Sequence, residues 1–252
     1  MSNKLDLSKE LVGRRALVTG GTRGNGAAIA QRLLDAGAKV VVAARARNDD
    51  TPAEMTFVPG DVATSEGVDA IAAEALTVLG GLDILVNNAG GGSAFMGGSW
   101  TIPDKEWHDN FELNLFAAIR LTNAVLPALR ASKAAAVVNI SSAAATMPFG
   151  PFAQYGAAKA ALEYYSRTLA MELAPNGIRV NVVSPGVIST PGSAEFAKTT
   201  PGFSTDVWIQ NIPLGRIGEA EEIAEVVALL ASDRGKFITG ANYRVDGGMT
   251  AR

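Results

Sequence analysis

Residues 15–26, RALVTGGTRGNG, pass directly from a strand-like apolar run into a glycine-rich turn. The run Arg15–Thr19 predicts a β-strand, and the stretch after the turn, Gly26–Ala36, has the apolar spacing of an amphipathic helix. Glycines at such a junction let the backbone turn tightly and approach an anion, which the helix N-terminus stabilises. Many strand–helix turns bind nothing, so it is the position after the first strand that predicts a dinucleotide site.

The alternation of strand and helix continues along the whole chain. The expected strands are nearly continuous apolar runs, as in parallel strands covered on both faces: Arg15–Thr19, Lys39–Ala43, Thr56–Val58, Asp83–Val86, Ala136–Ile140, Ile178–Val183 and Asn242–Val245. The expected helices are amphipathic: Gly26–Ala36, Ser65–Leu79, Asp104–Ala131, Tyr155–Leu173 and Ala220–Ala231. This order predicts an α/β fold with a Rossmann-type, doubly wound parallel sheet of about seven strands and helices on both faces, a three-layer α/β/α arrangement.

No linker, repeat or low-complexity tract divides the chain, so residues 1–252 are expected to form a single domain. Two connections are unusual. Residues 45–61 contain Pro52 and Pro59, which leave little room for a full helix. Residues 186–215 are rich in Gly, Pro, Ser and Thr and are too long for an ordinary connector, so we expect them to form a substrate loop or lid.

The composition narrows the function classes. The 252 residues include no cysteine and one histidine, His108, so disulfides and thiolate metal sites are excluded and no metal is expected. The net charge of −3 offers no basic surface for nucleic acid or a membrane. The polar N-terminus lacks the apolar core of a signal peptide, and no apolar run is long enough to span a bilayer. We therefore expect a cytoplasmic protein.

The glycine turn has the spacing TGxxxGxG, and with it the chain resembles the short-chain dehydrogenase/reductase family, in its compact single-domain branch. The resemblance runs from about Leu11 to Gly248, and the family's other motifs follow in order: Asp61, NNAG at 87–90, Asn114, Ser142, Tyr155 with Lys159, and Pro185-Gly186. One position differs from the family's glycine motif: Asn25 stands where the family usually has an apolar residue. The resemblance implies a ketoreductase or alcohol dehydrogenase that uses a nicotinamide cofactor.

The resemblance also implies the residues of the site. The catalytic residues would be Asn114, Ser142, Tyr155 and Lys159. The cofactor-binding residues would be Gly20, Thr22, Arg23, Gly24, Asn25, Gly26, Arg45, Asp61, Val62, Asn88, Ala89, Gly90, Tyr155, Lys159, Pro185, Gly186, Ile188 and Thr190. Among these, Asp61 would meet the adenine amino group, and Ile188 and Thr190 the carboxamide. The expected substrate contacts are Ser142, Phe95, Met96, Met147 and Trp208.

Tyr155 and Lys159 are four residues apart, so on a helix both side chains point from one face. A free phenol has a pKa near 10, and a nearby lysine cation is expected to lower that pKa towards working pH. The same ammonium could hold the nicotinamide ribose. The local sequence leaves Ser141 as plausible as Ser142, and the separation of thirteen residues from Tyr155 favours Ser142. The family's pattern implies that Asn114 interrupts its helix and holds a water that links Lys159 to solvent.

The end of the second strand, Ala43-Ala44-Arg45, has no acid to read a ribose 2′-hydroxyl. Arg45 and Arg23 stand where two cations would flank a 2′-phosphate, which a guanidinium binds through a fixed fork of donors. Either could instead be a solvated surface arginine. The pair predicts a preference for NADP(H), with NAD(H) as the alternative.

The segments after NNAG and after Ser142 are small or apolar, so we expect a small hydrophobic carbonyl or alcohol as the substrate. A 3-oxoacyl thioester is an alternative, with Arg130 and Lys133 as the only hint of a docking surface. Another alternative is a non-catalytic NADP(H)-binding regulatory protein. An epimerase or dehydratase of this fold would need an extra C-terminal domain. Members of the family are commonly tetramers or dimers, and a homo-oligomer is expected here.

Overall fold

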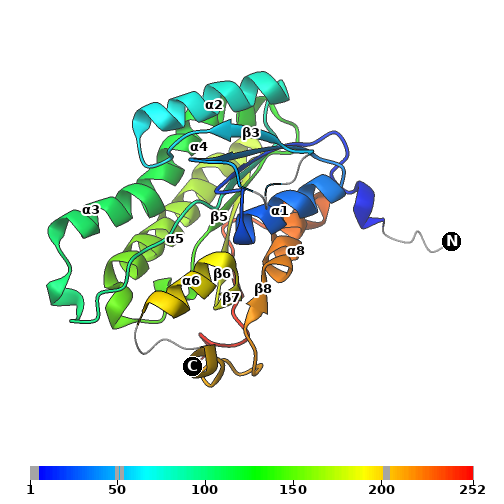
Figure 1. Cartoon of the computed structure of the whole chain (residues 1–252). Coiled ribbons are helices and arrows are strands. Elements are labelled where there is room, and N and C mark those ends of the chain that lie inside the picture. Colours follow the sequence, from blue (N-terminus) through cyan, green and yellow to red (C-terminus); the bar gives the residue numbers. More distant parts are fainter. Residues whose placement is uncertain (1–5, 49–50, 52–53, 201–204, 252) are drawn as a thin grey trace.

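The computed structural model describes residues 6–48, 51, 54–200 and 205–251 (Figure 1). Seven parallel strands form one sheet in the order β3-β2-β1-β4-β5-β6-β9. Their bounds are β1 Arg15–Thr19, β2 Lys39–Ala44, β3 Thr56–Pro59, β4 Ile84–Asn87, β5 Ala136–Ile140, β6 Arg179–Pro185 and β9 Asn242–Val245. The predicted doubly wound parallel sheet is therefore confirmed.

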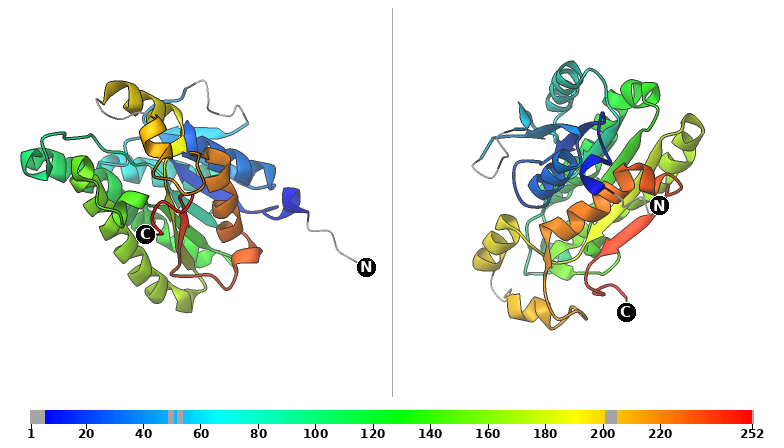
Figure 2. Two further views of the ribbon diagram at one scale, coloured as in Figure 1. Left: turned by 90° about the horizontal axis from the view of Figure 1, so that it is seen from below. Right: turned by 90° about the vertical axis from the view of Figure 1, so that its right-hand side faces the viewer.

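Helices cover both faces of this sheet, and the three layers are visible in Figures 1 and 2. The helices α1 and α8 pack on one face, whereas α2, α4 and α5 pack on the other. Their bounds are α1 Gly24–Asp35, α2 Ser65–Leu79, α4 Ala117–Ala131, α5 Ala153–Leu173 and α8 Ala220–Ala231.

Strand β1 shows why the strand sequences are apolar throughout. Ala16 and Val18 belong to the hydrophobic cluster under α1 and α8, and Leu17 between them belongs to the cluster on the opposite face. Successive side chains of a strand point to opposite faces, so a sheet that is covered on both sides buries every residue. All three side chains are fully buried.

The long helix expected at Asp104–Ala131 is divided. Helix α3 (Asp104–Phe111) passes into a π-helical turn at Glu112–Phe116 before α4 begins. Asn114 lies in that turn, and its side chain bonds to backbone groups of Gly91 and Asn110 instead of facing solvent. A π-helical turn inside a helix often marks a functional position, and the expectation that Asn114 interrupts the helix is met.

The two unusual connections also have definite structures. Residues 45–61 contain no helix in their described part. Residues 186–215 hold the short strand β7 (Ile188–Ser189), helix α6 (Pro191–Thr199) and helix α7 (Thr205–Ile209), while residues 201–204 lie outside the described part. Strand β7 pairs with β8 (Gly218–Glu219) in a separate parallel ladder. Within the described residues, no helix combines the length and apolar character needed to cross a membrane.

The order of the strands determines where a ligand can bind. The chain starts at β1, builds outward to β3, then returns to place β4 on the other side of β1. In open α/β sheets ligands bind beyond the carboxyl ends of the strands at this reversal. The glycine turn follows β1 and residues 87–90 end β4, so both lie at this point.

Candidate active site

A cavity of about 940 Å³ opens at the carboxyl ends of the strands. It is lined by every residue for which the family's pattern implies a cofactor contact, from the glycine turn to Thr190, and by Ser142, Met147 and Trp208. Its volume lies at the upper end of the range for ligand pockets, about 300–1,000 Å³. The sheet thus brings segments from most of the chain into one site.

The glycine turn is shaped for the close approach of an anion. Gly20 and Gly24 have φ of 63° and 53°, which disfavours a side chain, and a Cβ on Gly26 would lie 2.1 Å from the carbonyl oxygen of Gly20. Helix α1 starts at Gly24, and the N-cap residue Arg23 makes no side-chain hydrogen bond to the first turn. The first backbone N–H groups therefore remain available to a phosphate. These features fit a dinucleotide pyrophosphate.

The end of β4 is fastened to this turn. The hydroxyl of Thr19 accepts hydrogen bonds from the backbone N–H groups of Asn88 and Ala89, both at 3.0 Å. The side-chain amide of Asn88 in turn donates to the carbonyl of Thr19 at 2.9 Å. These contacts tie the end of β4 to the end of β1 at the floor of the cavity.

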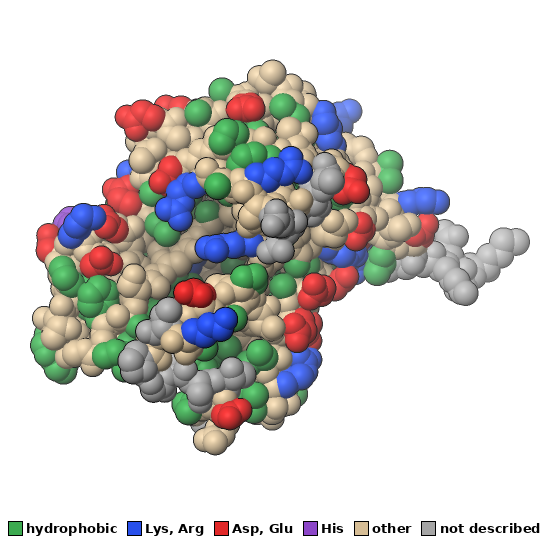
Figure 3. All heavy atoms as spheres, in the orientation of Figure 1, with side chains coloured by type: hydrophobic (Ala, Val, Ile, Leu, Met, Phe, Trp, Pro, Cys, Tyr) green, Lys and Arg blue, Asp and Glu red, His purple; other side chains and the backbone are tan. Residues whose placement is uncertain are grey.

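Three arginines lie along the outer part of the cavity. Arg23, Arg45 and Arg47 all line it, and the first two form no ion pair with any described residue. Lys and Arg side chains gather near the middle of the face seen in Figure 3. Ala44, at the end of β2, also lines the cavity and brings no negative charge. Arg47 was missed from the sequence, although its place two residues after Arg45 was the available signal.

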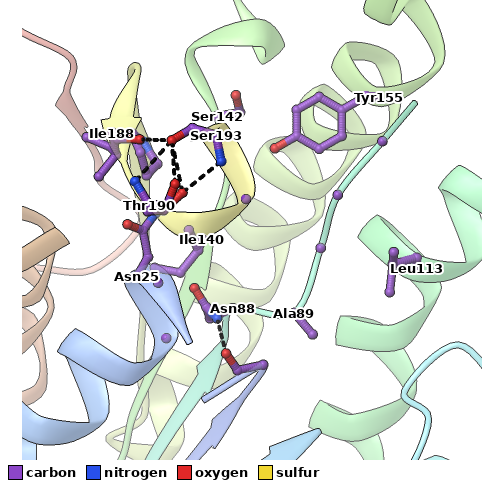
Figure 4. A pocket seen from close by; sticks show the side chains of 18 of the residues that line it. Asn25, Asn88, Ala89, Leu113, Ile140, Ser142, Tyr155, Ile188, Thr190 and Ser193 are labelled. Carbon is purple, nitrogen blue, oxygen red and sulfur yellow. Dashed lines mark hydrogen bonds between the residues drawn. The ribbon is translucent and has the colours of Figure 1, made fainter. Parts of the chain in front are cut away.

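Ser141 and Ser142 have different surroundings in the structure. The Ser141 hydroxyl is buried and donates to the Glu163 carboxylate at 2.8 Å. Ser142 faces the cavity, accepts a hydrogen bond from the N–H of Ala144 at 3.2 Å, and lies within hydrogen-bonding reach of Tyr155 (Figure 4). The preference for Ser142 over Ser141 is therefore supported by geometry that the local sequence did not contain.

Lys159 is 3% exposed, and its ammonium donates to the carbonyl of Ile140 at 2.8 Å. The ammonium lies 5.8 Å from the ring centroid of Tyr155. Burial lowers the pKa of Lys159 to about 8. Burial also raises the pKa of the Tyr155 hydroxyl above its ordinary value of 10.0, with the hydrogen bond to Ser142 acting in the opposite direction.

These directions correct the expectation that Lys159 lowers the pKa of Tyr155 in the protein alone. The ammonium donates a hydrogen bond to the end of β5 and lies 5.8 Å from the centroid of the tyrosine ring, while burial of the phenol is the largest influence on its pKa. A neutral Tyr155 hydroxyl at neutral pH is a proton donor.

Asn114 lies beside this pair without reaching the main cavity. It is 2% exposed and borders a small cavity of about 10 Å³ that Lys159 also lines. A volume of this size is close to that of one water molecule. A Cβ on Gly90 would lie 2.8 Å from the Asn114 side-chain oxygen and 2.9 Å from the Lys159 ammonium, so glycine keeps the space between them open.

An aromatic wall borders the cavity on the side of Tyr155 and consists of Phe149, Phe152, Phe196 and Trp208. Phe149 stacks on Phe152 at 5.7 Å and contacts Trp208 at 5.4 Å, while Phe152 contacts Phe196 at 5.1 Å. Phe152 also meets Tyr155 edge-on at 6.4 Å. Phe152 and Phe196 were missed from the sequence, because their segments are distant along the chain.

Phe95 and Met96, two of the expected substrate contacts, do not line the cavity, so a role for them in substrate binding stays a prediction of the sequence. The backbone N–H of Phe95 bonds to the carbonyl of Pro151 at 2.9 Å, which ties this segment to the residues just before α5. Met96 is 56% exposed.

Comparison with known proteins agrees with this site. A family model described as enoyl-(acyl carrier protein) reductase matches residues 20–250. The 3-oxoacyl-[acyl-carrier-protein] reductase FabG of Escherichia coli is 38% identical over 245 residues, which cover 94% of this chain and 97% of the relative. The 3beta-hydroxysteroid dehydrogenase 1 of Eggerthella lenta is 37% identical, with 96% and 95% covered.

Solved structures show the same fold. A Pseudomonas aeruginosa RhlG/NADP active-site complex superposes with a TM-score of 0.88 at 34% identity and covers 98% of this chain and 100% of that one. The ligand-free aldohexose dehydrogenase of Thermoplasma acidophilum gives a TM-score of 0.89 at 31% identity, with 97% and 96% covered. The chain therefore belongs to the short-chain dehydrogenase/reductase family of oxidoreductases.

Proposed function

We propose that this chain is an NADP(H)-dependent oxidoreductase that interconverts a ketone and a secondary alcohol, with Tyr155 as the general acid or base. The observation that carries the proposal is the meeting of Tyr155, Ser142 and Lys159 in one cavity with the uncapped N-terminus of α1. A proton donor thereby lies in the same space as a cradle for a dinucleotide.

The chain's own groups perform the proton transfer and the positioning. A bound nicotinamide supplies or accepts the hydride at the carbonyl carbon. The Ser142 hydroxyl donates to the substrate oxygen and stabilises the negative charge that develops there. Tyr155 then gives its proton to that oxygen, so the ketone gains a hydride and a proton and becomes the alcohol. In oxidation the same proton returns to Tyr155.

Lys159 and Asn114 support this step. The ammonium of Lys159 would hold the hydroxyls of the nicotinamide ribose and stabilise the tyrosinate left after proton transfer. A water in the small cavity between Asn114 and Lys159 would pass a proton from solvent to the lysine. This role depends on the π-helical turn, which turns the Asn114 amide towards Gly91.

The preference for NADP(H) rests on Arg23, Arg45 and Arg47 at the adenosine end of the cavity. A 2′-phosphate placed between guanidinium groups forms charge-assisted hydrogen bonds, whereas a 2′-hydroxyl leaves the repulsion between the cations uncompensated. Use of NAD(H) is the alternative. The NADP in the complex of the P. aeruginosa relative agrees with the preference.

The substrate is proposed to be small, neutral and hydrophobic because the wall beside Tyr155 is made of aromatic rings. Similarity to FabG makes a 3-oxoacyl thioester the second candidate. The exposed residues Arg130 and Lys133 are the cations that the sequence offers for docking its carrier. A homo-oligomer is also proposed, since Tyr164 and Met171 on α5 are 69% and 80% exposed. A cytoplasmic location stays a prediction of the sequence.

A panel of carbonyl compounds tests the proposal. Purified protein is mixed with NADPH and each ketone, aldehyde or 3-oxoacyl thioester, and the decrease in NADPH absorbance is followed. Turnover of an apolar ketone supports the proposal, and turnover of the thioester alone selects the second candidate. Tight binding of NADPH without turnover of any compound would instead support the non-catalytic regulatory protein.

A further inference from the structure

Gly92 lies in the segment that follows β4, directly against the side chain of Tyr155. A Cβ added to Gly92 would lie 2.9 Å from the Cβ of Tyr155 and 3.2 Å from Cγ, the first atom of the phenol ring. Carbon atoms in ordinary contact are about 3.5–4.0 Å apart, so no side chain fits between this backbone and the ring. Figure 4 shows the chain beyond Ala89 running alongside the Tyr155 ring.

This segment is fastened on both sides of the contact. On the side of β4, the Asn114 side chain donates to the carbonyl of Gly91 at 2.8 Å and accepts from the N–H of the same residue at 3.1 Å. On the other side, the side-chain amide of Gln154 donates to the carbonyl of Ser93 at 2.7 Å. Gln154 is fully buried and immediately precedes Tyr155 on α5. The segment therefore cannot withdraw from the ring without breaking these bonds.

Other neighbours restrict the Tyr155 ring in further directions. Phe152 meets the ring edge-on at 6.4 Å between centroids, and the Lys159 ammonium lies 5.8 Å from its centroid. The hydroxyl bonds to Ser142 in this position of the ring. A rotation about the Cα–Cβ bond that moved Cγ away from Gly92 would move the hydroxyl farther still, because it is the side-chain oxygen most distant from that bond. A residue without a side chain at position 92 thus allows the ring to keep the hydroxyl beside Ser142.

We propose that Gly92 is a positioning residue for Tyr155: its backbone, held through Asn114 and Gln154, fixes the phenol ring so that the hydroxyl reaches the substrate oxygen. Proton transfer requires the donor within about 2.6–3.2 Å of the acceptor. A displacement of about 1 Å can lower a rate about 100-fold. This inference rests on the proposed function, because it gives the position of the ring a catalytic consequence.

Gly92→Ala tests this role because it adds only the methyl group that the contact excludes. Gly150→Ala is the matched control, since a Cβ on Gly150 would meet no atom of the described chain within 4 Å and the residue does not line the main cavity. Gln154→Leu is a second variant, which removes the donor to Ser93 without adding an atom at position 92. For each protein, the Kd of NADPH is measured, and then the single-turnover rate with the ketone that the wild type reduces fastest in the carbonyl panel.

Gly92→Ala is expected to lower the single-turnover rate about 100-fold, while the Kd of NADPH stays within about twofold of the wild type. Gln154→Leu removes one hydrogen bond from the segment and is expected to lower the rate about fivefold. Gly150→Ala should keep the wild-type rate. Added to Tyr155→Phe, Gly92→Ala should lower the residual rate no further, because the hydroxyl that it displaces is already gone.

A Gly92→Ala protein that reduces the ketone at the wild-type rate would overturn the inference alone, because the ring would then tolerate the methyl group. An undiminished further loss in the double variant with Tyr155→Phe would also overturn it, since the substitution would then act on something other than the hydroxyl. If Gly92→Ala does not fold, the same comparison with Gln154→Leu decides. Failure of the wild type to reduce any ketone would overturn the proposed function as well, so the two failures are distinguishable.

Discussion

The ammonium of Lys159 donates a 2.8 Å hydrogen bond to the carbonyl oxygen of Ile140, the last residue of β5. No described carboxylate forms an ion pair with this buried lysine. The strand end thus holds the cation in the cavity, and the cation has no countercharge that would restore an ordinary pKa. This arrangement has a consequence for stability that can be measured without substrate.

The stability of the protein should depend on pH through Lys159. Its pKa is about 8 in the folded protein and 10.5 when solvated. Below both values the lysine is charged in both states, and the folded state bears the full cost of desolvation. As the pH rises from about 8 to about 10.5, the folded protein loses this proton first, so its free energy of unfolding rises relative to a variant without the group, by up to about 3 kcal/mol.

Urea unfolding of the wild type and Lys159→Met, at several pH values across this range, measures the effect. Subtracting the variant removes the contribution of all other titrating groups. A difference between the two proteins that stays constant with pH would show that Lys159 keeps its ordinary pKa in the fold.

Substitution of Ser142 should lower activity, whereas substitution of Ser141 should lower stability. Ser142→Ala removes the donor to the substrate oxygen and is expected to lower kcat about 100-fold or more, with little change in unfolding. Ser141→Ala leaves the Glu163 carboxylate without one of its buried partners, so it should reduce stability by about 1–3 kcal/mol and largely spare kcat. Steady-state kinetics and urea unfolding of both variants check this, and a larger loss of kcat in Ser141→Ala would reverse the assignment.

Arg45→Asp should exchange the cofactor preference. The new carboxylate repels a 2′-phosphate and can bond a 2′-hydroxyl, so kcat/KM with NADPH is expected to fall about tenfold to 100-fold while that with NADH is kept or rises. Arg130→Asp makes the same change of charge at an exposed residue that does not line the cavity, and serves as the control. If the wild type already prefers NADH, the proposed role of the arginines is wrong.

Phe196→Ala should weaken the binding of apolar ketones. It removes from α6 a ring that packs at 5.1 Å on Phe152, and the lost apolar surface is expected to raise KM about tenfold with a smaller effect on kcat. Met96→Ala, at an exposed residue outside the cavity, should leave both constants unchanged. Equal effects of the two substitutions would show that the aromatic wall does not contact the substrate.

Much of the fold follows from local sequence. Strand β1 and helix α2 begin and end at the predicted residues. A buried parallel strand is a continuous apolar run, whereas an amphipathic helix repeats its apolar residues at a spacing of three or four, so the two patterns can be told apart. The motifs also predicted the cofactor-binding residues that line the cavity, since most of them follow the end of a strand that the topology brings to one edge, and Tyr155 and Lys159 lie on α5 beside it. The order of the strands in the sheet is therefore what brings these residues together in one cavity.

The features that escaped prediction depend on contacts between distant segments. The partner of Lys159 is the backbone carbonyl of Ile140, and a backbone partner leaves no pattern in the sequence. The contact between Phe152 and Phe196 requires the fold of residues 186–215, which the sequence indicated only as a loop. The direction of the Tyr155 pKa shift depends on how deeply the phenol is buried in the fold, and a spacing of four residues on a helix does not determine that.

The most direct test of the central claim is the reduction of a ketone by NADPH in Tyr155→Phe, followed in a single turnover with enzyme in excess. The substitution removes only the hydroxyl, so NADPH should bind with nearly wild-type affinity while the rate of hydride transfer falls about 100-fold to 10,000-fold. A Tyr155→Phe protein that reduces the ketone at the wild-type rate would contradict the claim that Tyr155 transfers the proton.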